Sequence, residues 1–283
     1  MTNKYTQLDK YSVLMSVYAK EKPEYLRQSI DSMLNQTVSP DQFVLVKDGP
    51  LTKELDAVVN QYIVDYPDLF DVVNLSENKG LGVALDEGLR HCRNELVARM
   101  DSDDISLSNR CERQLECFKN NPSLSIVSGY VGEFSDTPEK IESIRIVPEC
   151  QKEIQRLMRV RSAFNHPAVM YKKSEVERCG GYGESIRKED HDLFSRMMNM
   201  NCKAYNIQSV VLHYRYGKSN LKRKKSWKSI SSYIKVMWDN YNKGFCGLFD
   251  FLYVCVAQLM LFILPMSISD FLIKKFYRKS GKN

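Results

Sequence analysis

Eight residues decide the fold: Val97-Ala98-Arg99-Met100-Asp101-Ser102-Asp103-Asp104. Apolar residues and one arginine run directly into three carboxylates within four positions. Burying unpaired charges is too costly, so these acids must face water, a cation, or both. Oxygen ligands of this kind suit a hard divalent ion such as Mg²⁺ or Mn²⁺, often shared with substrate phosphates. The stretch therefore indicates a strand ending at a metal and phosphate site. The alternative is a solvated turn that caps the next helix.

Strand and helix patterns alternate through the first half of the chain. Short apolar runs predict strands over residues 11–18, 43–46, 70–75 and 96–100. Helical spacing fills the intervals, which predicts an α/β, Rossmann-like fold with a mostly parallel sheet and helices on both faces. Ligands of such sheets bind beyond the carboxyl ends of the strands. Four polar side chains follow strand ends and are expected to line one cleft: Tyr18, Asp48, Asn78 and Asp101.

A later group of acids and two histidines have open roles. Glu189, Asp190 and Asp192 begin a helix, where acids are favoured by the helix dipole, so a structural role is the alternative to a chemical one. His166 precedes a proline and either lines the cleft or is an ordinary surface side chain. His213 follows a short apolar run and is either a metal or diphosphate ligand or a core or surface histidine.

The charge of the chain is divided unevenly. Residues 213–283 carry 14 Lys and Arg against 3 Asp, whereas residues 1–212 carry 27 basic and 32 acidic residues. The basic end needs an anionic partner such as membrane lipid or polyphosphate. The acidic remainder argues against nucleic-acid binding by the protein as a whole.

An apolar run over residues 251–266 lies between two basic clusters. Its 16 residues fall short of the ~20 that a spanning helix needs, and a single span would place one cluster outside. We predict a re-entrant or in-plane membrane anchor; the alternatives are one transmembrane helix or a buried helix in an oligomer. The expected organisation is a domain over residues 1–215 and a C-terminal helical, membrane-associating region over 216–283.

In this order the motifs resemble those of the GT-A family 2 glycosyltransferases, the inverting nucleotide-sugar transferases of bacterial surface polysaccharide synthesis. The matching stretches are residues 12–18, 48–49, 78–89 and 98–105, and Glu189-Asp190 with the helix behind them. They cover roughly the first 215 residues. The sequence around Arg99–Asp104 is most similar to the amylovoran-type exopolysaccharide and O-antigen transferases.

The resemblance implies a role for each matching residue of the nucleotide half. Asp48 would accept the N3–H of uracil, and Asn78 and Gly80 would lie against the ribose and diphosphate, where glycine allows close backbone approach. Asp101 would sit beside the ribose and metal, and Asp103 would be the direct ligand of Mn²⁺ or Mg²⁺. The resemblance also assigns three more residues to the nucleotide-sugar site: Tyr18, Arg99 and Ser102.

The resemblance further implies a base and an inverting mechanism. Asp190 would deprotonate the acceptor hydroxyl for in-line attack at the anomeric carbon, and one displacement inverts that centre. Glu189 would orient the base or bind the acceptor, and Asp192 is the alternative base. The chain departs from many relatives at Lys47, which stands where they have an acid, and at Asp86, which stands where they have Asn.

The expected function is transfer of a hexose from a UDP-sugar, with UDP-galactose or UDP-glucose favoured, to a glycan on a polyprenyl diphosphate. The expected location is the cytoplasmic face of the bacterial inner membrane, peripheral or monotopic, held by anionic lipids. Two alternatives remain. One is a non-catalytic membrane scaffold with a transferase-like fold. The other is a sugar-1-phosphate nucleotidyltransferase, which usually has a Gly-rich phosphate loop after its first strand; none follows residues 11–18 here.

Overall fold

The computed structural model describes residues 10–183, 188–217, 225–269, 271 and 278–280. The strands are β1 (Tyr11–Val17), β2 (Gln42–Lys47), β3 (Phe70–Asn74), β4 (Leu96–Asp101), β5 (Ile105–Ser106), β6 (Leu124–Phe134), β7 (Ser143–Arg145), β8 (Met170–Lys172), β9 (Lys203–Arg215) and β10 (Lys279–Ser280). The helices are α1 (Pro23–Leu34), α2 (Lys53–Asp65), α3 (Leu81–His91), α4 (Arg110–Asn120), α5 (Gln151–Met158), η1 (His166–Ala168), α6 (Lys173–Arg178), α7 (Glu189–Asn199), α9 (Trp227–Asn242) and α10 (Leu248–Ile263).

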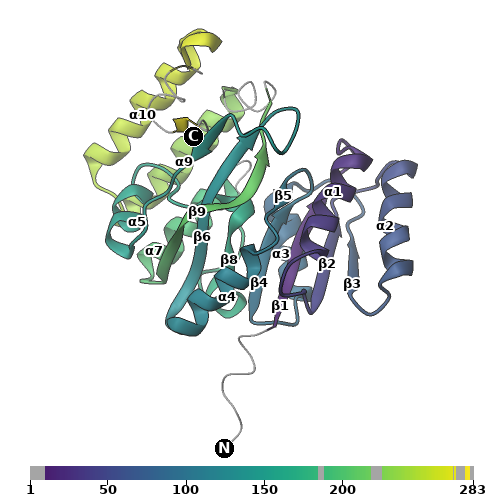
Figure 1. The fold of residues 1–283 in the computed structure, drawn as a ribbon. Helices are drawn as coiled ribbons and strands as arrows, with labels where there is room; N and C mark the ends of the chain where they lie inside the picture. The colour runs from purple at the N-terminus through teal and green to yellow at the C-terminus, as the bar shows by residue number, and fades with distance from the viewer. Residues whose placement is uncertain (1–9, 184–187, 218–224, 270, 272–277, 281–283) are drawn as a thin grey trace, which may run out of the picture.

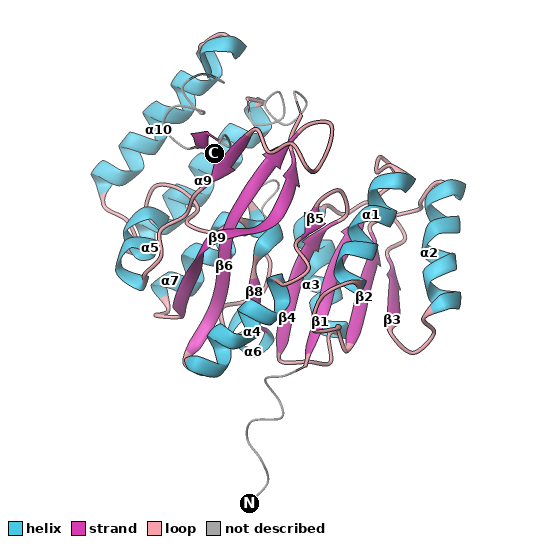
Figure 2. Ribbon diagram, viewed as in Figure 1, coloured by secondary structure: helices cyan, strands magenta, loops and turns pink. Residues whose placement is uncertain are grey.

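The N-terminal half of the sheet is parallel, as predicted. β1 lies between β2 and β4, and β3 pairs with the far edge of β2. β1, β2 and β3 are each followed by a helix that returns the chain to the opposite end of the sheet, which is how parallel neighbours must be joined. The carboxyl ends of these strands therefore meet along one edge of the sheet (Figure 2).

Beyond β4 the sheet is mixed, so the prediction of a mostly parallel sheet holds for the first half only. β8 runs antiparallel to both β4 and β6, and β7 runs antiparallel to β6, whereas β9 pairs with β6 in parallel. Residues 135–142 connect β6 to β7, and this loop is shorter than the dozen residues that a parallel crossover needs. Figure 1 shows β6 and β9 as the two long strands of this half.

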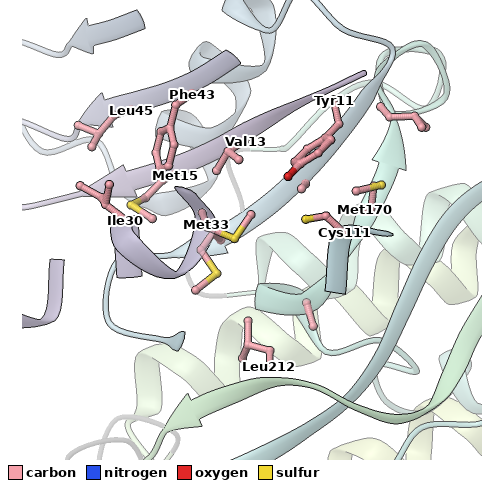
Figure 3. Packing of buried hydrophobic residues seen from close by; sticks show 14 of the residues in the cluster. Tyr11, Val13, Met15, Ile30, Met33, Phe43, Leu45, Cys111, Met170 and Leu212 are labelled. Carbon is pink, nitrogen blue, oxygen red and sulfur yellow. The ribbon is translucent and has the colours of Figure 1, made fainter. Parts of the chain in front are cut away.

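Helices cover both faces of the sheet, as predicted. Successive strand residues point to opposite faces, so Val13 and Met15 pack against α1, α2 and α4, whereas Leu14 packs on the side of α3, α5 and α7. Figure 3 shows the first of these cores, with Ile30 of α1 against the strands. Because both faces are buried, the strands read as nearly continuous apolar runs.

Gly88 illustrates how closely α3 lies on the sheet. A Cβ atom at this position would come within 2.5 Å of Leu14 Cδ1 and of Val46 Cγ2. The missing side chain lets the C-terminal half of α3 lie directly on β1 and β2.

A buried arginine fastens the end of β4 to its surroundings. Arg110, at the start of α4, donates from Nη2 to the carbonyl oxygens of Arg99 at 2.7 Å and Val169 at 3.1 Å. Gln114, one turn later, donates to Ala168 O at 2.8 Å. These bonds satisfy carbonyl groups that a buried irregular segment would otherwise leave unpaired. They fix the strand that carries the acidic stretch.

The C-terminal helices pack on the sheet domain through α7. The ring of Tyr233 in α9 meets His191 of α7 edge-on, with centroids 5.1 Å apart, and Trp238 of α9 lies 5.5 Å from Phe251 of α10. Figure 1 shows α10 at the outer side of this layer. Among the described residues, no helix combines the length and apolar character needed to cross a bilayer. Part of the predicted basic cluster, residues 218–224, lies outside the described residues.

Candidate active site

One cleft of about 1480 Å³ opens at the carboxyl ends of the parallel strands. It is lined by ten residues that sequence analysis selected: Tyr18, Asp48, Asn78, Gly80, Arg99, Asp101, Ser102, Asp103, Glu189 and Asp190. Segments far apart in the chain thus meet in one place, because parallel strands deliver their carboxyl ends to the same edge. Asp192 and His213 are not among the described residues that line it.

Three carboxylates crowd the end of β4. One oxygen each of Asp101, Asp103 and Asp104 lies within 4.8 Å of the others. Asp104 is fully buried; its Oδ1 accepts from the Arg215 backbone N–H at 2.8 Å, whereas its Oδ2 has no hydrogen-bond partner in the described part of the chain. Burial, and then the negative charges of Asp101 and Glu21, raise the pKa of Asp103 to about 7.

This crowding fits a divalent cation. Carboxylates at such separations repel one another, and a buried oxygen without a partner costs free energy that a bound cation removes. An all-oxygen donor set of this kind suits Mg²⁺ or Mn²⁺. Asp104 belongs to the set by position, although sequence analysis gave metal roles only to Asp101, Asp103 and His213.

Arg99 lies beneath the acid cluster and is almost completely buried. Its Nη2 is paired with the Asp101 carboxylate. Its Nε and Nη1 have no partner among the described residues. Buried guanidinium nitrogens normally find acceptors, so two open donors beside a cleft suit an anionic or hydroxyl-rich ligand. Ser102 is anchored separately, since its hydroxyl donates to Glu21 at 2.8 Å.

The Asp48 carboxylate is held by the loop that precedes α3. Lys79 N donates to Oδ1 at 2.7 Å, while Gly80 N and Asn78 Nδ2 donate to Oδ2 at 3.1 and 3.0 Å. Gly49 permits this approach, because it has a φ of +85° and a Cβ there would come within 2.6 Å of Asn78 N. A carboxylate oxygen accepts two bonds, so Oδ1 retains one open acceptor position.

The acids at the start of α7 separate into two groups. Glu189 and Asp190 line the cleft, and burial followed by the charge of Asp190 raises the pKa of Glu189 to about 7. Asp192 instead pairs with Arg196 one turn later, at 3.0 Å. Arg196 also donates to the carbonyl oxygen of Gly181 at 2.8 Å, so Asp192 supports the chain that leads into α7.

The two histidines with open roles lie in different places. His166 is buried in the cleft wall, with Nε2 3.0 Å from the Tyr182 hydroxyl, and burial together with the charge of Arg99 holds its pKa well below the usual range. It is therefore neutral at physiological pH. His213 lies in β9 opposite Ile105 of β5, and the acid cluster of the described residues contains carboxylates only. We leave His213 out of the proposed site.

Several cleft residues carried no signal in the sequence. Glu21 follows β1 by a short turn, Arg145 ends β7, and Arg278 lies next to β10 at the far end of the chain. Glu21 lies between two lysines, Arg145 lies between two isoleucines, and Arg278 is one of several basic residues after the apolar run, so residue type and spacing do not single out any of them. The acidic triplet could have indicated Asp104, which directly follows Asp103.

A half-sheet of parallel strands, a strand ending in an Asp-x-Asp pair and acids from a later helix in the same cleft together make the arrangement expected of a nucleotide-sugar transferase. The model of Glycosyl transferase family 2 matches residues 12–180. The chain belongs to this family, and it is a glycosyltransferase.

Named relatives are similar to this chain over nearly its whole length. A UDP-Gal:alpha-D-GlcNAc-diphosphoundecaprenol beta-1,3-galactosyltransferase of Escherichia coli is 36% identical, covering 95% of this chain and 97% of that protein. The amylovoran biosynthesis glycosyltransferase AmsE of Erwinia amylovora is 31% identical, covering 94% and 98%.

Solved structures share the fold at low identity. The mannosyltransferase PcManGT of Pyrobaculum calidifontis, in complex with GDP-Man and Mn²⁺, has a TM-score of 0.62 at 17% identity, covering 94% of this chain and 75% of that one. S. aureus TarS 1–349 in complex with UDP-GlcNAc has a TM-score of 0.60 at 16% identity, covering 94% and 71%. These likenesses confirm the GT-A-like fold.

The raised pKa of Glu189 predicts a pH-dependent stability. Because the folded protein holds this proton more tightly than the unfolded chain, stability falls as pH rises from about 4.5 through about 7. Glu189→Gln removes this cost, so the variant should be more stable than wild type at pH 8, by on the order of 1–3 kcal/mol, and nearly equal at pH 4. Urea denaturation at both pH values measures the difference.

Asp192→Asn is the matched control. It removes an acid from the same turn of the helix, but this acid is ion-paired with Arg196. It should be less stable than wild type at both pH values. A Glu189→Gln variant that is destabilised at pH 8 would show that the Glu189 charge is compensated in the folded protein.

Proposed function

We propose that the protein is an inverting, metal-dependent hexosyltransferase that moves a sugar from a UDP-sugar to a glycan linked to a polyprenyl diphosphate. The observation that carries the proposal is the convergence of three features in one cleft: the acid cluster at the end of β4, the loop-held Asp48 carboxylate, and Asp190. Together they supply a cation site, a base-recognition site and a proton acceptor.

The donor is a UDP-sugar, for which Asp48 provides the recognition. The open position on Asp48 Oδ1 can accept the N3–H of uracil, whereas cytosine presents an acceptor at that edge. Asn78 and Gly80 lie directly beside this carboxylate, so the ribose and diphosphate would follow along the same loop. The similar E. coli enzyme uses UDP-Gal, which favours UDP-galactose over UDP-glucose as the hexose donor.

The negative charge that develops on the departing diphosphate is the reason that we assign a metal ion to this site. Asp103, with Asp101 and Asp104 beside it, would hold Mn²⁺ or Mg²⁺. When bound, such an ion supplies Lewis-acid stabilisation of the negative charge that develops on the departing UDP. Arg99 holds Asp101 from below, and its two open N–H groups point to a second, fixed source of positive charge at this end of the cleft.

The base is Asp190. It lines the cleft, whereas Asp192 is engaged by Arg196. Asp190 would accept the proton of the acceptor hydroxyl as that oxygen attacks the anomeric carbon, and a single displacement converts an α-linked donor into a β-linked product. Glu189, half-protonated near neutral pH beside Asp190, would bind the acceptor or orient the base.

The wall of the cleft that α10 forms is the basis for the proposed acceptor. Tyr253, Ala257 and Leu261 of α10 line the same cleft as the acids. The outer side of α10 is strongly exposed, with Phe249 at 87% and Ile263 at 74%. An apolar helix at the mouth of a sugar-transferring cleft suits a substrate whose lipid stays in a membrane, at the cytoplasmic face of a bacterial inner membrane.

The family assignment answers the two alternative functions. A sugar-1-phosphate nucleotidyltransferase belongs to another class of enzyme, and the match over residues 12–180 is to a glycosyltransferase family. A scaffold without activity has no need for Asp103 and Asp190 to line one cleft beside an intact Asp48 loop. The transferase is the function that these residues support.

Loss of the central metal ligand tests the donor half. Asp103→Ala should abolish transfer and weaken UDP binding at least ~10-fold in the presence of Mn²⁺, while binding in EDTA changes little, because only the metal-mediated part is lost. Isothermal titration calorimetry with UDP measures both. The control is Asp65→Ala, an exposed acid of α2 outside the cleft. Near-normal turnover of Asp103→Ala would contradict the assignment.

Two neighbouring substitutions test the base. Asp190→Asn keeps the size of the side chain but removes its basicity, so transfer should fall by at least ~10²-fold with little change in UDP-sugar affinity. Asp192→Asn should keep most of the turnover. Initial rates with UDP-galactose and a lipid-diphosphate acceptor measure both. If instead Asp192→Asn is the inactive variant, the base is Asp192; an α-linked product by NMR would exclude a single displacement.

Charged substitutions on α10 test membrane binding without truncating the chain. Phe249→Glu with Ile263→Glu should reduce binding to vesicles containing anionic lipid, because each replaces an exposed apolar side chain with one that anionic headgroups repel. Flotation of protein with vesicles measures the bound fraction. Val64→Glu is the control, since Val64 is 75% exposed on α2. Equal flotation of all variants would refute the proposed anchor.

A further inference from the structure

A second cationic group lines the cleft, separate from Arg99. Glu133 of β6, which is 2% exposed, binds two arginines at once. Arg145 of β7 donates from Nε to Oε1 at 2.5 Å, and Arg278 approaches Oε2 with Nε at 2.6 Å and donates to Oε1 from Nη2 at 2.8 Å. The Ser143 hydroxyl also donates to Oε2. Both oxygens of the single carboxylate are therefore fully used.

The two guanidinium groups are not fully used. Arg145 Nη2 and Arg278 Nη1 are buried and have no hydrogen-bond partner in the described residues. The Arg278 side chain is 3% exposed, yet both arginines belong to the lining of the cleft. One carboxylate faces two cations, so the group carries an excess positive charge with open donors at the cleft. Buried groups of this kind are ordinarily satisfied, which points to a missing anion.

Aromatic rings hold these arginines in place. The Arg145 guanidinium lies 4.1 Å from the centroid of the Tyr214 ring, and the Arg278 guanidinium lies 4.4 Å from that of Tyr216. Stacking and the bonds to Glu133 fix the plane of each guanidinium group, so little side-chain entropy would be lost when an anion binds. Two preorganised guanidinium groups suit a ligand with several phosphate oxygens.

The location of the group favours the acceptor over the donor. The donor end already has its own charges, namely the acid cluster with a metal and the open nitrogens of Arg99. Arg145 ends β7 and Arg278 directly precedes β10, and these two strands lie at the opposite edge of the sheet from β2, which Asp48 follows. The same cleft is walled by α10. A ligand at Arg145 and Arg278 can thus continue into an apolar chain.

We propose that Arg145 and Arg278, held by Glu133, form a clamp for the diphosphate of the lipid-linked acceptor. The inference rests on the proposed function, which supplies a glycosyl diphosphate lipid as acceptor. The clamp holds the diphosphate, α10 receives the lipid, and the sugar extends towards Asp190. Arg145 and Arg278 are substrate-binding residues in this arrangement and take no part in proton transfer.

The test compares two acceptors that differ only in the diphosphate: N-acetylglucosaminyl diphospho-lipid and the same sugar as a lipid glycoside without phosphate. Arg145→Gln and Arg278→Gln should each raise KM for the diphosphate acceptor about 10- to 100-fold, the loss of a charge-assisted contact. Both should leave KM for UDP-galactose and the rate with the phosphate-free acceptor within about twofold of wild type.

The design includes controls for folding and for charge. Arg156→Gln removes an exposed arginine of α5 that does not line the cleft, and it should behave as wild type. Arg145→Lys and Arg278→Lys keep the positive charge beside Glu133 but lack the planar guanidinium group. These variants should fold and show an intermediate increase in KM for the diphosphate acceptor. If the Gln variants do not fold, a Lys variant with unchanged KM for the diphosphate acceptor overturns the clamp.

The outcomes separate the clamp from the proposed function. Wild type using both acceptors equally would refute the lipid-diphosphate acceptor, and the clamp with it. Wild type preferring the diphosphate acceptor, with Gln variants that keep the full preference, would refute the clamp alone. A rise in KM for UDP-galactose in the variants would assign the arginines to the donor and would also overturn it.

Discussion

Repulsion among the carboxylates at the end of β4 is the constraint on which the rest of the site depends. Asp101, Asp103 and Asp104 lie together because the chain around them is held rigidly. The Arg215 backbone binds Asp104, and Arg99 pairs with Asp101. Arg110 secures the carbonyl of Arg99 from behind. Each of these contacts fixes the acids in a geometry that they would not adopt alone, which is how a cation site is preorganised.

The two halves of the sheet contribute different residues to the cleft. The parallel half brings Asp48, the loop before α3 and the acid cluster to one edge, which suits a nucleotide diphosphate. The mixed half and the C-terminal elements add Arg145, Arg278 and the wall formed by α10. Because α7 packs against both α3 and α9, Asp190 lies where the two sets of residues meet.

Several groups in the site lower the free energy of unfolding of the protein, which is consistent with a functional role for them. Glu189 and Asp103 are held where their ionised forms are unfavourable, since burial and neighbouring acids raise the pKa of each to about 7. Arg99 keeps two buried nitrogens without partners among the described residues. Asp192, which does not line the cleft, is by contrast paired with Arg196. Natural proteins tolerate such local conflicts mainly at functional sites.

The sequence by itself determined the parallel half, because apolar runs and helical spacing report burial and period directly, and it selected Asp48, Asp101, Asp103 and Asp190 through strand ends and motif order. Only the tertiary structure showed that Glu189 and Asp190 line the cleft whereas Asp192 does not, and that β8 enters the sheet antiparallel. Only the tertiary structure showed that Arg145 and Arg278, which are remote in the chain, both bind Glu133. Long-range pairing of single charges leaves no periodic trace, so it is decided where strands from distant segments come together.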